Sequence, residues 1–208
     1  MLRALLVAVL LCGPAYAQQV YEDLLFAVNN DRVDELRALL ARGVDPNSVD
    51  PGGNPLLFIA ARNGSLATVN ALIAAKAKVD QPNRSNDTPI MVAALQGHAD
   101  IVRRLREAGA TLDPPGWTPL IYAATGGKLP VVRYLLEQGA NIDAGSPNGT
   151  TALMMAVREH RIDVAEFLLA RGADVRRRND AGMTALTYAE QGNETEFAAR
   201  LRKAGAQR

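Results

Sequence analysis

The chain has 208 residues, of which 23 are Lys or Arg and 22 are Asp or Glu. This near-neutral balance provides no long-range field that would attract nucleic acid, so we expect no nucleic-acid partner. There is a single cysteine, Cys12, which excludes a disulfide framework within the chain.

Residues 1–17 have the composition of a secretory signal peptide. Arg3 precedes an apolar run at 4–11, and Ala15-Tyr16-Ala17 is the small-x-small triplet typical of a cleavage site. The run is shorter than the ~20 residues that a membrane span needs. We therefore predict cleavage after Ala17, a periplasmic or secreted protein, and no membrane span.

Two sets of residues recur along the remaining chain at the same intervals. Both sets are spaced by 33, 33, 30, 33 and 33 residues. The first set is Asp31, Gly64, Gly97, Gly127, His160 and Asn193, and the second is Gly43, Lys76, Gly109, Gly139, Gly172 and Gly205. Such a period indicates a solenoid, and Gly or Asn commonly ends a helix in the left-handed conformation. Each unit is therefore predicted to be a helical hairpin.

The period divides residues 18–208, taken as a single domain, into six units. In chain order they cover about 20–52, 53–85, 86–115, 116–148, 149–181 and 182–208, with the first and last acting as caps. The unit at 86–115 ends three residues early and reaches the next through Asp113-Pro114-Pro115-Gly116. We expect that connection to be shorter and stiffer than its counterparts.

Apolar residues keep the same positions in every unit. One position holds only alanine: Ala27, Ala60, Ala93, Ala123, Ala156 and Ala189. Another, three residues earlier, holds Leu24, Leu57, Ile90, Leu120, Leu153 and Leu186. In the second helices, pairs such as Leu135 and Leu136 are predicted to supply the rest of the core. Helices this short are marginal alone, so each unit must be stabilised by its neighbours.

The unit at 116–148 resembles the ankyrin-repeat family. Its Thr118-Pro119-Leu120, Ala123-Ala124 and Gly139-Ala140-Asn141 match that family's signature. The resemblance implies a mainly α ankyrin-repeat solenoid of stacked helical hairpins with β-hairpin-like finger loops. With the signal peptide, the chain looks like the bacterial secreted or periplasmic members.

The chain departs from the family at the position after the conserved leucine. The family's histidine there is absent and is replaced by Phe58, Met91, Ile121, Met154 and Thr187. That histidine ties repeats together by hydrogen bonds in the family. We therefore expect the units of this chain to rely more on apolar packing.

No catalytic motif is recognisable after the signal peptide. His98 and His160 stand two units apart, too far to share a metal, so we expect no metal, no cofactor and no enzyme activity. Carboxylates cluster at Asp31, Asp34 and Glu35, which we interpret as a solvated helix surface. The alternative is an enzyme, or an enzyme subunit, that uses a carboxylate pair in the groove.

The family resemblance implies a concave groove that binds proteins, and transferring its positions one by one gives fifteen candidates. They are Asn54, Arg62, Asn63, Arg84, Asp87, Leu95, Gln96, Trp117, Thr125, Thr150, Arg158, Glu159, Asp180, Met183 and Gln191. Trp117 is the only tryptophan, and Trp and Arg are enriched among residues that dominate binding energy. The alternative is that Trp117 packs on its own finger.

The sequence therefore predicts a non-catalytic, monomeric protein-protein interaction module that presents its groove to a protein of the bacterial cell envelope. A self-associating structural scaffold is a further alternative. The basic run Arg176-Arg177-Arg178 is interpreted as a solvated loop, with an acidic protein partner as the other reading.

Overall fold

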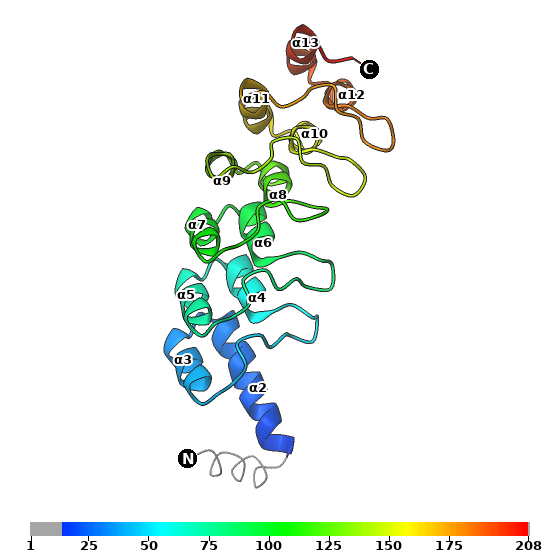
Figure 1. Ribbon diagram of the computed structural model, residues 1–208. Coiled ribbons are helices and arrows are strands. Elements are labelled where there is room, and N and C mark those ends of the chain that lie inside the picture. The colour runs from blue at the N-terminus through cyan, green and yellow to red at the C-terminus, as the bar shows by residue number, and fades with distance from the viewer. Residues whose placement is uncertain (1–13, 208) are drawn as a thin grey trace.

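The computed structural model describes residues 14–207, and within this range the chain forms twelve helices in six consecutive pairs (Figure 1). The predicted signal peptide lies outside the described residues except for 14–17, which begin the first helix. The pairs are α2 (Pro14–Asn29) with α3 (Val33–Ala41), α4 (Leu56–Asn63) with α5 (Leu66–Ala74), α6 (Pro89–Gln96) with α7 (Ala99–Glu107), α8 (Pro119–Thr125) with α9 (Leu129–Glu137), α10 (Ala152–Arg158) with α11 (Ile162–Ala170), and α12 (Ala185–Gln191) with α13 (Thr195–Lys203).

The helices form two layers that run along the stack. The first helices of successive units pack on one another from α2 to α12, and the second helices α3, α5, α7, α9 and α11 do the same. Long loops project from the first-helix side, one between each two units (Figure 1). The prediction of a mainly helical solenoid of stacked hairpins is confirmed.

The turns follow the two recurring sets of the sequence. All twelve residues have positive φ, from 53° at Asp31 to 99° at Gly109. Lys76 and His160 adopt this conformation although they carry a side chain that disfavours it. The period therefore specifies backbone geometry even where glycine is missing.

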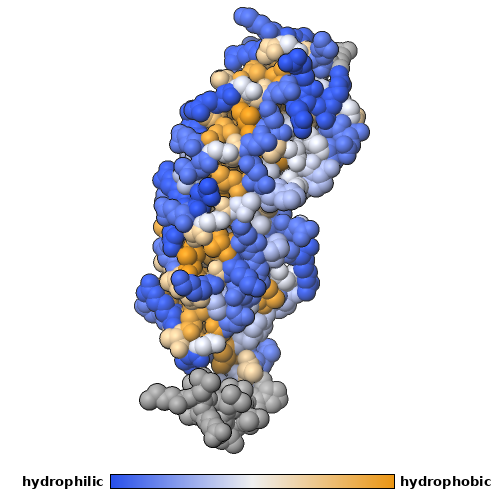
Figure 2. Space-filling view, in the orientation of Figure 1, coloured by the Kyte–Doolittle hydropathy of each residue, from blue (hydrophilic) through white to orange (hydrophobic). Residues whose placement is uncertain are grey.

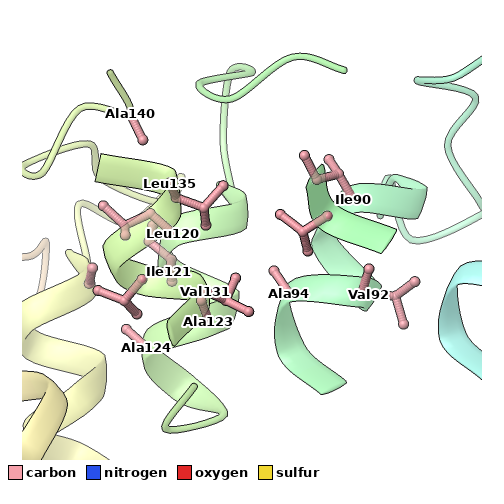
Figure 3. Close-up of a cluster of buried hydrophobic side chains, with 14 of the residues drawn as sticks. Ile90, Val92, Ala94, Leu120, Ile121, Ala123, Ala124, Val131, Leu135 and Ala140 are labelled. Carbon is pink, nitrogen blue, oxygen red and sulfur yellow. The ribbon is translucent and has the colours of Figure 1, made fainter. Parts of the chain in front are cut away.

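Alanine and leucine columns form the core (Figure 3). The six alanines of the all-alanine position have no exposed surface, because neighbouring first helices approach closely there. In the second helices the same leucine position is buried in every unit: Leu39, Leu72, Leu105, Leu135, Leu168 and Leu201. Leu136 is only half-buried, so the two leucines of that pair contribute unequally.

The finger loops contain less β structure than the resemblance implied. Within residues 14–207 the only β pairing consists of two isolated bridges, Val49 with Pro55 and Gly145 with Thr151. Four fingers are closed by one backbone hydrogen bond across a tight turn, from the N–H of Asp50, Asn83, Ser146 and Asn179 to the carbonyl four residues later, at 2.9, 2.9, 2.9 and 3.0 Å. The finger at 111–117 has no such bond and is three residues shorter than its counterparts.

Successive units are also joined, beside their apolar contacts, by polar bonds at the base of the fingers. A side chain in one unit accepts a hydrogen bond from a backbone N–H in the next: Asn47 from Lys78, Asp80 from Thr111, Asp113 from Asn141 and Asp143 from Asp174. Arg176 holds the following position and has no acceptor, so the series ends at the last unit.

Replacing Asp80 with alanine is expected to lower the free energy of unfolding by about 1 to 2 kcal/mol. Its carboxylate accepts from the Thr111 N–H at 3.2 Å and from the Thr111 hydroxyl at 2.7 Å. Asp80→Asn should retain most of the stability, because an amide oxygen can still accept. Chemical denaturation compares both with Asp180→Ala, an exposed finger carboxylate without such a bond. Equal losses in all three variants would contradict this role.

Candidate functional site

An apolar hollow of about 200 Å³ lies on the first-helix layer, where three units meet. It is lined by Leu95 from α6, Trp117, Tyr122 and Thr125 in and before α8, and Met155 from α10. Trp117 remains 37% exposed, and its ring meets that of Tyr122 edge to face, with centroids 6.0 Å apart. The hollow is too small for a drug-sized molecule, whose sites measure about 300 to 1,000 Å³, and matches a single side chain.

A polar pair fixes one wall of this hollow. The Tyr122 hydroxyl donates a hydrogen bond to Asp87, which stands at the end of the preceding finger. Burial and this bonded, negatively charged carboxylate raise the pKa of Tyr122 well above its usual range. The hydroxyl therefore stays protonated near neutral pH and holds the ring in place beside Trp117.

Four of the fifteen predicted residues are thus brought together: Leu95, Trp117 and Thr125 line the hollow, and Asp87 anchors its wall. The sequence analysis missed Tyr122 and Met155. Both stand two residues after the Leu column, where the other units have Phe26, Ile59, Val92 and Tyr188. A large side chain at this position was the available signal, but it does not separate Tyr122 and Met155 from Phe26 and Tyr188.

A second group of predicted residues lies at the ends of the first helices. Arg62 and Asn63 end α4, Gln96 ends α6 and Gln191 ends α12, and all four are exposed. Arg158 ends α10 and pairs with the neighbouring Glu159 at 3.0 Å. These residues occupy equivalent positions in different units, so they can face a common partner.

The finger residues divide into exposed and structural ones. Arg84 and Asp180 are exposed, and Met183 is half-buried at the foot of its finger. Asn54 donates to both carboxylate oxygens of Asp50, at 3.1 and 2.9 Å. Thr150 is only 3% exposed and accepts a hydrogen bond from Asn179, so it cannot belong to a binding surface and that prediction is wrong.

The carboxylates of this surface have structural partners. Burial opposes ionisation of Asp50, but hydrogen bonds from Asn54 and Gly52 and the charge of Arg62 hold its pKa below the ordinary value. Asp50 is therefore an ionised acceptor that shapes its finger and not a proton donor. Within residues 14–207 no three His, Cys, Asp or Glu side chains are grouped to hold a metal ion.

Fold and hollow together define an α-solenoid repeat protein with a side-chain-sized site on its first-helix layer. The chain belongs to the ankyrin-repeat family: the family model described as "Ankyrin repeats (3 copies)" matches residues 24–115 and 106–179. The crystal structure of the human ASB11 ankyrin repeat domain is similar, with a TM-score of 0.79 and 29% identity, covering 87% of this chain and 82% of that one.

Two curated relatives match shorter segments. Alpha-latrocrustotoxin-Lt1a of Latrodectus tredecimguttatus is 36% identical over 91 residues, which is 43% of this chain and 6% of the toxin. The probable E3 ubiquitin-protein ligase XBOS31 of Oryza sativa subsp. japonica is 42% identical over 62 residues, which is 28% of this chain and 14% of the ligase. The matched segment is a small part of the length of either relative, and the likeness lends no support to a particular bacterial relative. No helix within residues 14–207 combines the length and apolar character needed to cross a membrane.

Proposed function

We propose that this protein is a non-catalytic interaction module of the bacterial cell envelope that binds a protein partner in the groove containing the Trp117 hollow. Ankyrin repeats generally mediate protein-protein interaction, and proteins of this family are typically non-catalytic. The observation that carries the proposal is the hollow itself. It leaves the only tryptophan part-exposed beside apolar residues from three units.

Energy and geometry both favour a protein partner at this place. Interface hot spots are commonly Trp or Tyr residues that lie next to pockets and take up an anchor side chain. Trp117 and Tyr122 are held by edge-to-face packing and by the bond to Asp87, so little side-chain entropy is lost on binding. The catalytic alternative has no such support, since Asp50, Asp87 and Glu159 are each bonded to a neighbouring side chain.

Self-association is a second candidate, favoured by the N-terminal end of the stack. A hollow of about 250 Å³ lies there between α2 and α3, lined by Asp23, Phe26, Glu35, Ala38, Leu39 and Arg42. Phe26 is 55% exposed. Light scattering over a concentration series separates the two functions: a constant monomer mass rejects self-association, and a mass that falls after Phe26→Ser supports it.

Capture from a bacterial envelope extract tests the proposed function. The wild-type chain and Trp117→Ala are used as bait, and bound proteins are compared by mass spectrometry. A partner retained by wild type and lost with the variant supports the groove. Identical capture by the two baits would place the working surface elsewhere.

We expect the chain to be processed after Ala17 when it is expressed from Met1 in a bacterium. The mature N-terminus should be Gln18, found in the soluble envelope fraction, because the Ala15-Tyr16-Ala17 triplet fits signal peptidase. Cleavage there would remove the first turn of α2, including Tyr16, whose hydroxyl accepts a bond from Arg42. N-terminal sequencing decides the matter, with Ala17→Leu as the unprocessed control. Intact Met1 on cytoplasmic protein would contradict secretion.

A further inference from the structure

Basic side chains form a column across the ends of the first helices. His98, Lys128 and Arg161 are the residues that immediately precede α7, α9 and α11. Each lies over the turn of the preceding unit. The His98 ring nitrogen Nε2 is 3.2 Å from the Arg62 carbonyl oxygen, and Arg161 Nε donates to the Thr125 carbonyl at 3.3 Å. Carbonyl ends of helices carry partial negative charge, which favours cations there.

Glycine in the turns leaves room for the side chains of Lys128 and Arg161. A β-carbon at Gly97 would come within 2.7 Å of Lys128 Cδ, and one at Gly127 within 2.7 Å of Arg161 Cδ. The aliphatic parts of Lys128 and Arg161 therefore lie directly on the turns.

The cations flank the Trp117 hollow. Leu95, which lines the hollow, stands two residues before Gly97, over which Lys128 packs. Thr125, also in the lining, is the residue whose carbonyl binds Arg161. One apolar site is thus bordered by a positive side chain in each of two adjacent units.

Nearby carboxylates do not neutralise the positive charges of Lys128 and Arg161. Asp87 is bonded to Tyr122, and Glu159 is paired with Arg158. In the column itself, the first acidic residue is Glu194, which pairs with His160 at 2.8 Å. Among residues 14–207, neither Lys128 nor Arg161 has a carboxylate within ion-pair distance.

We propose that the groove binds an acidic segment of a partner protein, which inserts one apolar side chain into the Trp117 hollow and places carboxylates against Lys128 and Arg161. This inference rests on the proposed function and specifies the partner's chemistry. The charge complementarity and the hollow's single-side-chain size argue for it together. Nucleic acid is less suited, because the chain is nearly neutral and the hollow supplies one exposed indole instead of a row of stacking rings.

The repeat spacing sets the design of a probe. Packed helices lie about 8 to 10 Å apart, and a polyproline II segment has three residues per turn with a rise of about 3.1 Å per residue. Carboxylates on every third residue of such a segment lie on one face about 9 Å apart, and therefore match cations one unit apart. The probe is a fluorescein-labelled peptide with Glu at every third position, Leu at its centre, and Gly and Ser elsewhere. Matched peptides carry Lys in place of Glu, or Gly in place of the central Leu.

Fluorescence anisotropy with the full chain should show binding of the Glu-Leu peptide that weakens as salt rises. The Lys peptide should bind at least about tenfold more weakly, because like charges then face each other. The double variant Lys128→Glu with Arg161→Glu should lose at least about tenfold in affinity, and the two Gln substitutions a smaller factor. Trp117→Ala should lose about thirtyfold, as should the peptide without Leu.

The matched control reverses the charge of two basic residues on the second helices, Arg37→Glu in α3 and Lys203→Glu in α13. Arg37 pairs, among the residues that the structure describes, only with Asp34, whose side chain is 99% exposed, so its loss should cost little stability. This variant should bind the Glu-Leu peptide like wild type. Circular dichroism melts of all variants distinguish a loss of binding from a loss of folding. If the Glu variants melt at a lower temperature than wild type, the Gln variants replace them in the comparison.

Any of three results would overturn the inference. The first is equal binding of the Lys peptide, and the second is unchanged binding after both charge reversals. The third is displacement of the peptide by a single-stranded oligonucleotide that binds equally well to wild type and to Trp117→Ala. The last would assign a phosphate-binding surface. If any of these occurs while envelope-protein capture still depends on Trp117, the proposed function stands and only the acidic partner fails. If capture is also independent of Trp117, both fail.

Discussion

Replacing Leu135 with alanine is expected to lower the free energy of unfolding by about 2 to 5 kcal/mol, which is a large share of the about 5 to 15 kcal/mol of an ordinary domain. Leu135 has no exposed surface and lies beside Leu120 in the core between α8 and α9 (Figure 3). Removing its side chain leaves a cavity that the surrounding helices cannot fully close.

Leu136→Ala is the control for this prediction. Leu136 neighbours Leu135 in α9 but is half-buried, so its truncation should cost clearly less. Urea unfolding followed by circular dichroism measures both. We also expect a broader transition for Leu135→Ala, because a weakened interior unit lets the units on either side unfold more independently. A larger loss for Leu136→Ala would mean that α9 is rotated from the orientation described here.

Replacing Trp117, Arg62 and Arg158 together by alanine is expected to abolish most groove binding while leaving helix content and melting nearly unchanged. Loss of one hot-spot side chain commonly costs ~2 kcal/mol or more, about thirtyfold in affinity. The three side chains are exposed; the Trp117 ring meets that of Tyr122 edge to face, and Arg158 pairs with Glu159. Affinity for a captured envelope protein, measured by surface plasmon resonance, gives the readout.

The control for the groove variant has to lie on the second helices, and its side chains must not pack against a neighbouring helix. Arg103 is unsuitable, since its guanidinium lies 5.6 Å from the centre of the Tyr134 ring and supports α9. Arg37→Ala with Lys203→Ala is better matched, because both residues are exposed on α3 and α13. If this control failed to bind the partner while the triple variant still bound it, the second helices would form the binding face.

The Trp117 hollow differs from the apolar band that runs along the stack. Apolar residues form an interrupted band along the stack, bordered by hydrophilic side chains (Figure 2). Such a band is expected wherever two helix layers meet, and it gives no partner by itself. The Trp117 hollow differs because an aromatic side chain stays part-exposed there with its orientation fixed by neighbours.

The sequence by itself determined the repeat and the turns. Residues as different as Gly64 and His160 take the same left-handed conformation, because their place in the period and not their side chain decides where each helix must end. It also determined the all-alanine column, since only a small side chain fits where first helices touch. These features depend on local geometry repeated at a fixed interval, which can be read along one dimension.

The tertiary structure alone decided which residues meet between units. It buried Thr150, turned Leu135 and not Leu136 fully into the core, and joined Asp80 to Thr111. It also brought Leu95, Trp117 and Met155 around one hollow. These contacts link positions about one repeat apart, and they depend on the rotation and offset between stacked units. That rotation is a property of the whole packed stack, so no single segment of the sequence encodes it.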